Sequence, residues 1–135
     1  MSITSARAAL ERAVEGLTFE SESDEPLEVF VWPRADIGDE ISDAWIKDRH
    51  GAGSGDPVER LAFEDFFRPL VEHKKWHRKQ ESDVVRGYQK LFETIRTHLQ
   101  EVRVYKTGSI EKSVYIVGKT KTGDWAGIKT TAIET

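Results

Sequence analysis

The chain has 135 residues and 38% hydrophobic content, with four tryptophans, three tyrosines and six phenylalanines. This length supports one domain with its own hydrophobic core and is short for two, so we expect a single domain over residues 1–135. Although 33% of the residues are charged, the net charge is only −4, which lacks the basic excess of most nucleic-acid-binding proteins. The absence of cysteine excludes disulfides, thiolate metal sites and a cysteine nucleophile.

The N-terminal segment shows no pattern for secretion or membrane insertion. Arg7 and Glu11 interrupt its first apolar stretch, which a signal peptide would keep free of charge. No other stretch stays apolar for long enough to span a membrane. We therefore expect a soluble, cytoplasmic protein, which we take to be a monomer.

The first part of the chain predicts a helix, a loop and a strand. Apolar residues recur at helical spacing from about residue 3, and Gly16 stands where that helix would end. The acidic residues 20–26 end in a proline, which disfavours a continuous helix and predicts an exposed loop. Residues 27–33 are rich in β-branched and aromatic side chains and close on a proline, which is typical of a strand.

The middle of the chain has weaker patterns and then one strong helix. We expect a weak helix across residues 37–46, a flexible glycine-rich loop over residues 50–57 and a short helix over residues 63–70. Ser82 is a good N-cap for the next helix, whose broad apolar stripe continues to Leu99.

Three strand-like runs follow, over residues 102–105, 114–117 and 125–133. Turn residues at 107–108 and 121–124 separate them closely enough to predict an antiparallel meander. Early helices and late strands predict an α+β domain whose sheet is covered on at least one face by the long helix.

The chain offers little for catalysis. It has four histidines, no glycine-rich phosphate loop and no nucleophile motif, so we expect neither an enzyme nor a cofactor. His73 and His77 could share a helix face as metal ligands, but the cations beside them would repel a metal ion. Those cations are Lys74, Lys75, Arg78 and Lys79. We therefore expect no metal site of its own.

Three segments could contact a partner, and none is decisive alone. Residues 73–79 interleave Trp76 with cations, which could bind nucleic acid by stacking and phosphate attraction, unless Trp76 is a core residue. The acidic run from Glu20 to Glu28 could mimic phosphates, bind a hard cation or simply be solvated. Thr135 joins a hydroxyl to a terminal carboxylate, and hard oxygens of this kind are what magnesium prefers.

A set of residues along the whole chain resembles the nuclease A inhibitor family. Its first piece is Phe19-x-Ser-Glu-Ser-x-x-Pro-x-Glu-Val-Phe30. The later pieces keep the family's order at nearly its spacing, and they are Phe63-x-x-Phe66-Phe67, Trp76, Gln89-Lys-Leu91, Val104-Tyr105, Val114-Tyr115, Gly118, Ala126-Gly-Ile128 and Glu134-Thr135. No single piece is a signature, and the specificity lies in the collinear set.

The resemblance implies an α-β-α sandwich with a mainly antiparallel sheet, similar to the pathogenesis-related protein fold. It also implies a protein inhibitor of a metal-dependent, sugar-nonspecific endonuclease of the ββα-metal type. Three features would contact that nuclease, namely Glu22 of the Ser-Glu-Ser loop, Trp76 and the C-terminal Thr135. Neighbouring residues would complete the interface, and these are Ser21, Ser23, Asp24, Lys75 and Glu134.

The resemblance assigns each contact a chemical role. Glu22 would stand in for a scissile phosphate, Trp76 would be the apolar anchor, and Thr135 would approach the nuclease's magnesium. The segment around this tryptophan is acidic in the family, whereas here Lys75 precedes it and His77, Arg78 and Lys79 follow. This charge reversal predicts that the protein fails against the family's usual nuclease and suits a partner with an acidic rim instead.

Two alternatives stay open, and one region carries no transferred contact. The same fold could bind a different protein, or residues 73–79 could form a nucleic-acid-binding module. The low net charge makes direct nucleic-acid binding the weaker expectation. Residues 34–50 diverge from the family, so we transfer no contact to them.

Overall fold

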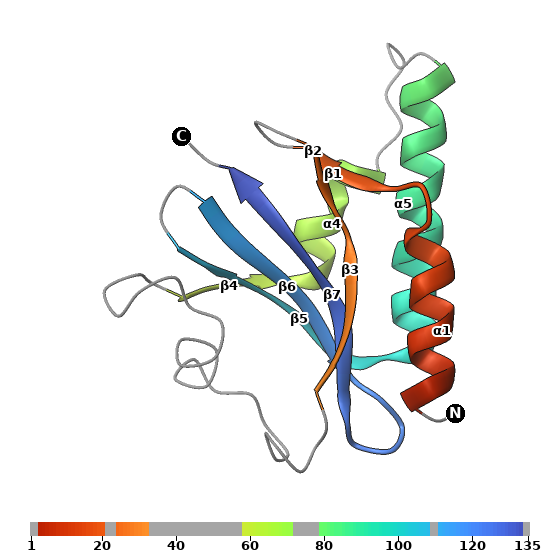
Figure 1. Cartoon of the computed structure of the whole chain (residues 1–135), viewed down its shortest axis with the longest axis vertical. Helices are drawn as coiled ribbons and strands as arrows, with labels where there is room; N and C mark the ends of the chain where they lie inside the picture. Colours follow the sequence, from red (N-terminus) through yellow and green to blue (C-terminus); the bar gives the residue numbers. More distant parts are fainter. Residues whose placement is uncertain (1–2, 21–23, 33–57, 72–78, 109–110, 134–135) are drawn as a thin grey trace.

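The computed structural model describes residues 3–20, 24–32, 58–71, 79–108 and 111–133. Within these ranges the protein has a five-stranded antiparallel sheet, a two-stranded hairpin and three helices (Figure 1). The α+β class predicted from the sequence is therefore confirmed. None of the described helices is long and apolar enough to cross a membrane.

The first helix, α1, spans Ile3–Val14, as predicted. Its buried side chains recur at helical spacing along one face, and they are Ala6, Leu10 and Ala13. Gly16 follows with a φ of 76°, the left-handed conformation that favours glycine after a helix. The Leu17 N–H donates to the Val14 carbonyl at 3.0 Å, which closes the last turn.

The acidic segment after α1 pairs with itself at its two ends. β1 (Thr18–Glu20) and β2 (Asp24–Pro26) form an antiparallel hairpin in which Thr18 stands opposite Pro26. Proline fits because this strand lies outside the main sheet and needs no donor for a central ladder. The exposed loop predicted for residues 20–26 is therefore wrong at these ends, since three-residue strands are too short for periodicity to reveal.

Two short strands form the edges of the main sheet. β3 (Glu28–Trp32) confirms the strand predicted over residues 27–33 and pairs with β7. β4 (Val58–Ala62) pairs with β5 at the other edge, and no pattern predicted it because its five residues include two charges and do not alternate. The predicted weak helix at 37–46 and the loop at 50–57 lie outside the described residues.

The predicted meander is confirmed. β5 (Gln100–Thr107), β6 (Glu111–Lys119) and β7 (Trp125–Ile133) pair antiparallel in chain order, and the full sheet order is β3-β7-β6-β5-β4. β5 and β6 are longer than predicted because backbone pairing continues through their polar ends. The turn before β7 is closed by the Thr120 N–H, which donates to the Asp124 carbonyl at 2.7 Å.

Two further helices pack together against the sheet. α4 spans Phe63–Val71 and α5 spans Lys79–His98, and the Phe63 and Phe92 rings stack with centroids 4.6 Å apart. α5 begins ahead of Ser82, so the predicted N-cap is wrong. Its apolar stripe starts only later, so a polar first turn left no periodic signal of the true start.

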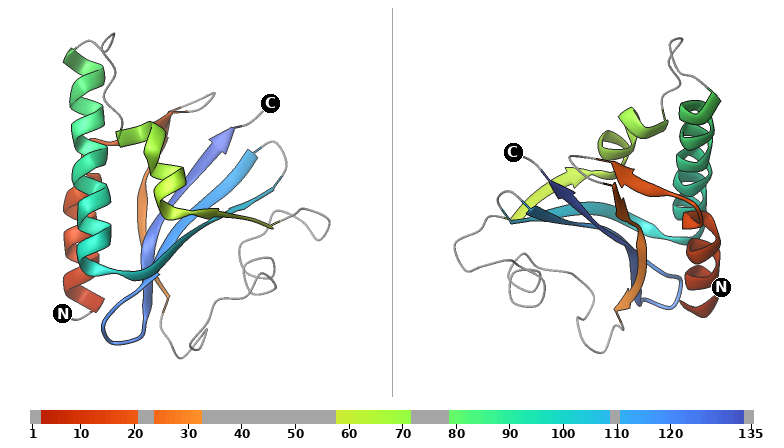
Figure 2. Two further views of the ribbon diagram at one scale, coloured as in Figure 1. Left: turned by 180° about the vertical axis from the view of Figure 1, so that it is seen from behind. Right: turned by 45° about the horizontal axis from the view of Figure 1, so that its top comes forward.

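Side chains alternate between the two faces of the sheet. Val114 and Ile116 of β6 join the core beneath the helices, whereas Tyr115 and Val117 join a cluster on the other face. The helix-side core also holds Leu10, Phe67, Leu91, Ile95, Val104 and Ile128. All the described helices lie on this one face (Figure 2), which confirms the predicted cover by the long helix. A second helical layer, and with it the α-β-α sandwich, stays a prediction.

Candidate functional site

Most of the predicted contact residues lie outside the described residues. These are Ser21, Glu22, Ser23, Lys75, Trp76, Glu134 and Thr135. Asp24 is described, as the first residue of β2 and opposite Glu20 of β1. The structure therefore gives the frame from which the three predicted contact segments emerge, rather than the contacts themselves.

The hairpin is fixed to the strand that leads to the C-terminus. Because β3 runs antiparallel to β7 with Glu28 opposite Lys129, the residues before Glu28 lie beside the part of β7 that follows Lys129. There the Thr130 hydroxyl donates to the Pro26 carbonyl at 2.9 Å. Leu27, between the hairpin and β3, is buried in the core. Both the hairpin and the end of β7 therefore point toward the same end of the molecule (Figure 1).

A second side-chain bond fixes the end of α4. The Gln89 side-chain amide of α5 donates to the Val71 carbonyl, the last residue of α4, at 2.9 Å. Carbonyls in the last turn of a helix have no partner within the helix, so this amide supplies one. The residues that carry Lys75 and Trp76 connect this point to the start of α5 at Lys79.

The described flanks of all three predicted segments lie at one end of the molecule. The hairpin, the end of β7, the end of α4 and the beginning of α5 share this end in every view (Figures 1 and 2). The turn before β7 and the beginning of α1 lie at the opposite end. The described flanks of segments far apart in the sequence thus meet at one end of the fold, which we call the contact end.

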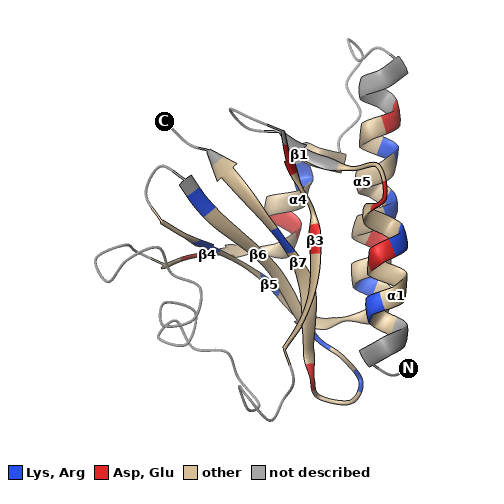
Figure 3. Cartoon of the chain, in the orientation of Figure 1, with Lys and Arg blue, Asp and Glu red and all other residues tan. Residues whose placement is uncertain are grey.

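An acidic residue next to the hairpin faces a basic residue on the neighbouring strand of the sheet. Glu28, exposed on β3, is the register partner of Lys129 on β7. Figure 3 shows acidic and basic positions on these two neighbouring strands. Opposite charges at facing positions stabilise a strand pair modestly. The Lys129 ammonium also lies 5.8 Å from the centre of the Tyr115 ring. Glu28 therefore faces a cation within the sheet, although its side chain remains exposed.

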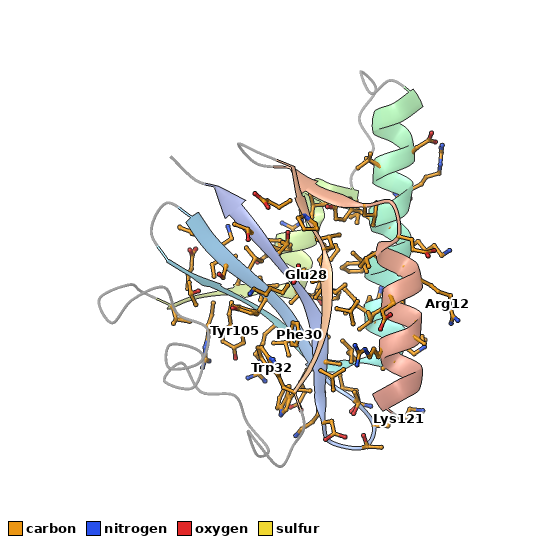
Figure 4. The ribbon with its side chains drawn as sticks, viewed as in Figure 1. Arg12, Glu28, Phe30, Trp32, Tyr105 and Lys121 are labelled. Atoms are coloured by element: carbon orange, nitrogen blue, oxygen red, sulfur yellow. The ribbon has the colours of Figure 1, made fainter. Side chains whose placement is uncertain are left out.

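The face of the sheet turned away from the helices carries a cluster of aromatic rings. Phe30, Trp32 and Tyr105 gather on this side (Figure 4), and the Phe30 and Trp32 centroids are 4.2 Å apart. Tyr105 and Trp125 are 0% exposed. A platform for stacking nucleic-acid bases needs accessible rings, so Tyr105 and Trp125 serve the core instead, whereas Phe30 and Trp32 are only partly buried.

Burial also shifts the pKa of one tyrosine on this second face. Burial raises the pKa of the Tyr115 hydroxyl above its ordinary value of 10.0, and a hydrogen bond from the Ser113 side chain lowers it in part. The hydroxyl therefore stays protonated at neutral pH.

The described residues give little support to metal binding or nucleic-acid binding. No group of three histidine, aspartate or glutamate side chains among the described residues could hold a metal ion. His98 is described, and its Nδ1 lies 3.0 Å from the Thr94 carbonyl within α5. His50, His73 and His77 lie outside the described residues, and so does the basic segment 73–79 apart from Lys79. The hypotheses on these residues therefore stay untested predictions.

Sequence patterns did not identify the two side-chain hydrogen bonds at the contact end, from Thr130 to Pro26 and from Gln89 to Val71. Thr130 and its partner Pro26 are separated by 104 positions, so no local pattern links them. Gln89 does stand in one piece of the family resemblance. Its role at the end of α4 becomes visible only when the two helices are placed side by side.

Comparison with known proteins agrees with the resemblance. A family model described as nuclease A inhibitor-like protein matches residues 4–135, nearly the whole chain. No curated protein matches this chain. The resemblance noted in the residues is confirmed by this match.

Proposed function

Because the chain belongs to the nuclease A inhibitor-like family, we propose that it blocks the active site of a metal-dependent, sugar-nonspecific endonuclease of the ββα-metal type. Family membership implies a nuclease inhibitor and a nuclease partner. The single observation that carries the proposal is the extent of the match, which covers residues 4–135 and therefore every predicted contact.

The proposed interface is the contact end, with Glu22, Trp76 and Thr135 as its principal residues. The convergence of their described flanks supports this choice, because one nuclease surface can then meet all three. Ser21, Ser23, Asp24, Lys75 and Glu134 would surround them.

Each principal residue would replace one substrate contact. The Glu22 carboxylate would pair with a cation that otherwise holds the scissile phosphate. Trp76 would fill an apolar pocket, where loss of a tryptophan typically costs about 2 kcal/mol or more, roughly a thirtyfold change in affinity. Thr135 would supply oxygen atoms toward the partner's magnesium, directly or through water. The inhibitor would then copy the substrate without offering a bond to cleave.

The basic residues around Trp76 would select the partner. Lys75 and Arg78 would meet an acidic rim favourably, whereas a basic rim would repel them at a cost of several kcal/mol. We assign the protein no reaction, cofactor or metal of its own, and we propose that it acts as a cytoplasmic monomer.

The test is cleavage of plasmid DNA by a panel of ββα-metal nucleases, titrated with the protein. We expect stoichiometric inhibition of a nuclease with an acidic rim. Inhibition should weaken with Glu22→Ala, Trp76→Ala or deletion of Thr135. It should stay unchanged with the matched control Glu93→Ala, which changes an exposed side chain of α5. Inhibition of no enzyme in the panel would contradict the proposal. Salt-sensitive binding of the protein to DNA itself would instead favour the nucleic-acid-binding module.

A further inference from the structure

We propose that Thr130 and Gln89 are positioning residues that set the geometry of the contact end before a nuclease binds, an inference that rests on the proposed function. Each ties the base of a predicted contact segment to a long element of the fold through one side-chain hydrogen bond.

Thr130 is a polar residue at a core position. Ile128 and Ala132, its neighbours on the same face of β7, both belong to the hydrophobic core. Thr130 itself is only 3% exposed, and its hydroxyl donates to the Pro26 carbonyl at 2.9 Å. Burying a hydroxyl is unfavourable unless it is bonded, and valine would fill nearly the same volume without that cost. The role of the Thr130 hydroxyl is therefore to hold the Pro26 carbonyl in place.

That partner is the base of the hairpin. The β1 and β2 strands are three residues long each and pair only with one another. A two-stranded hairpin of this length is marginal by itself, so its direction depends on what holds its base. The Thr130 bond joins the hairpin that carries Glu22 to the strand that ends two residues before Thr135.

Gln89 performs the equivalent task for the segment that contains Trp76. Its exposed side-chain amide donates to the Val71 carbonyl at 2.9 Å and so joins the end of α4 to the middle of α5. The connection from Val71 to Lys79 then begins and ends on elements of fixed relative position. Because the aromatic rings of α4 and α5 already pack together, the amide adds direction at the helix end rather than most of the packing energy.

A tethered segment loses less freedom when a partner binds. Without the tether, part of the binding free energy is spent on ordering the segment, so affinity falls although no contact residue has changed. One net hydrogen bond of this kind corresponds to a loss of about three- to tenfold in affinity.

The test for Thr130 compares single variants and one double variant in binding to an inhibited nuclease, with thermal unfolding measured in parallel. We expect Thr130→Val to weaken binding by about three- to tenfold and Thr130→Ser, which keeps the hydroxyl, to restore it. Thr97→Val is the matched control, because the Thr97 hydroxyl donates to the Glu93 carbonyl within α5. In a Glu22→Ala background the effect of Thr130→Val should largely disappear. Wild-type affinity of Thr130→Val, or an undiminished effect in the Glu22→Ala background, would overturn the assignment.

Gln89 has a parallel test. Gln89→Met keeps the shape of the side chain but removes the donor, and we expect a similar loss that vanishes in a Trp76→Ala background. Gln100→Met, an exposed glutamine at the start of β5, is the control. A Gln89→Met protein that binds like the wild type would overturn the role of Gln89.

Failure of the tether can be distinguished from failure of the proposed function. Amide hydrogen exchange of the free protein should be faster at residues 18–20 and at residues 24 and 25 in Thr130→Val than in the wild type. Unchanged exchange at these residues would overturn the tether whether or not any nuclease is inhibited. Faster exchange together with no inhibition would instead contradict the proposed function alone.

Discussion

The sheet beneath the helices and the contact end are built in different ways. β6 and β7 pair along nine residues and bury apolar side chains on both faces. The hairpin at the contact end has three-residue strands, and the contacts at its base include the buried Leu27 and the Thr130 hydroxyl, which donates to the Pro26 carbonyl. This difference leads us to expect that stability and nuclease binding can be changed separately. Many packing contacts would set the stability of the fold, whereas a few directed hydrogen bonds would set the affinity for a nuclease.

The largest effect on stability should come from the core far from the contact end. Ile95 of α5 is 0% exposed, and Ile95→Ala should cost about 2–5 kcal/mol of unfolding free energy through lost burial and an unfilled cavity. Urea unfolding measures this loss. Nuclease inhibition by the folded variant should match the wild type. Weakened inhibition by a protein that is still folded would break the separation of the two regions.

A smaller loss is expected where the backbone approaches its neighbours closely. A Cβ added at Gly118 would lie 2.8 Å from both Leu99 Cβ and Val102 Cγ2, so Gly118→Ala should cost about 1–3 kcal/mol by overpacking. Gly87→Ala is the control, because its added Cβ would meet only the flexible end of Leu17 and alanine favours a helix interior. Equal losses of unfolding free energy in the two variants would show that the approach at Gly118 is not tight.

Alkaline pH should lower stability through the second face of the sheet. The raised pKa of Tyr115 means that the unfolded chain loses this proton first as the pH rises above 10.0, so ionisation favours unfolding. Its contribution is fully present below that pH and is lost as the pH rises toward the folded pKa. Tyr115→Phe should therefore show a shallower fall in unfolding free energy between pH 9 and 11 (roughly the tyrosine range) than the wild type. Identical slopes would contradict this.

The smallest effect should come from the surface of α1. Arg7 and Glu11 form an exposed ion pair with Arg7 Nε and Glu11 Oε1 2.8 Å apart. Glu11→Gln should change the unfolding free energy by only about 0.3–0.5 kcal/mol, and less at high salt. Chemical unfolding at two salt concentrations measures this. A change as large as that of Gly118→Ala would mean that surface charge, rather than packing, dominates the stability of this fold.

The sequence predicted those parts of the fold that repeat a pattern over many residues. The alternation in β6 and β7 and the apolar stripe of α5 each mark one buried face, so element type and meander were predictable. The hairpin and β4 were not, because strands of three to five residues with charges give no period. Their pairing comes from tertiary contacts instead.

The candidate site was predictable only through the family resemblance. No local pattern distinguishes Trp76 from a core tryptophan or Thr135 from an ordinary terminus. The frame that holds their segments depends on bonds such as Thr130 to Pro26, between residues 104 positions apart. Such bonds follow from the folded arrangement and leave no trace in composition or spacing.

The most direct test of the account is to locate the nuclease on the inhibitor by amide hydrogen exchange, with and without a stoichiometric amount of an inhibited ββα-metal nuclease. We expect slower exchange in the complex at residues 18–25, at the end of β7 and between α4 and α5. We also expect the amides of the turn at residues 120–124 to exchange at the same rate in the complex as in the free protein. Protection centred on that turn or on the start of α1, with the hairpin unaffected, would contradict the contact end as the nuclease-binding surface.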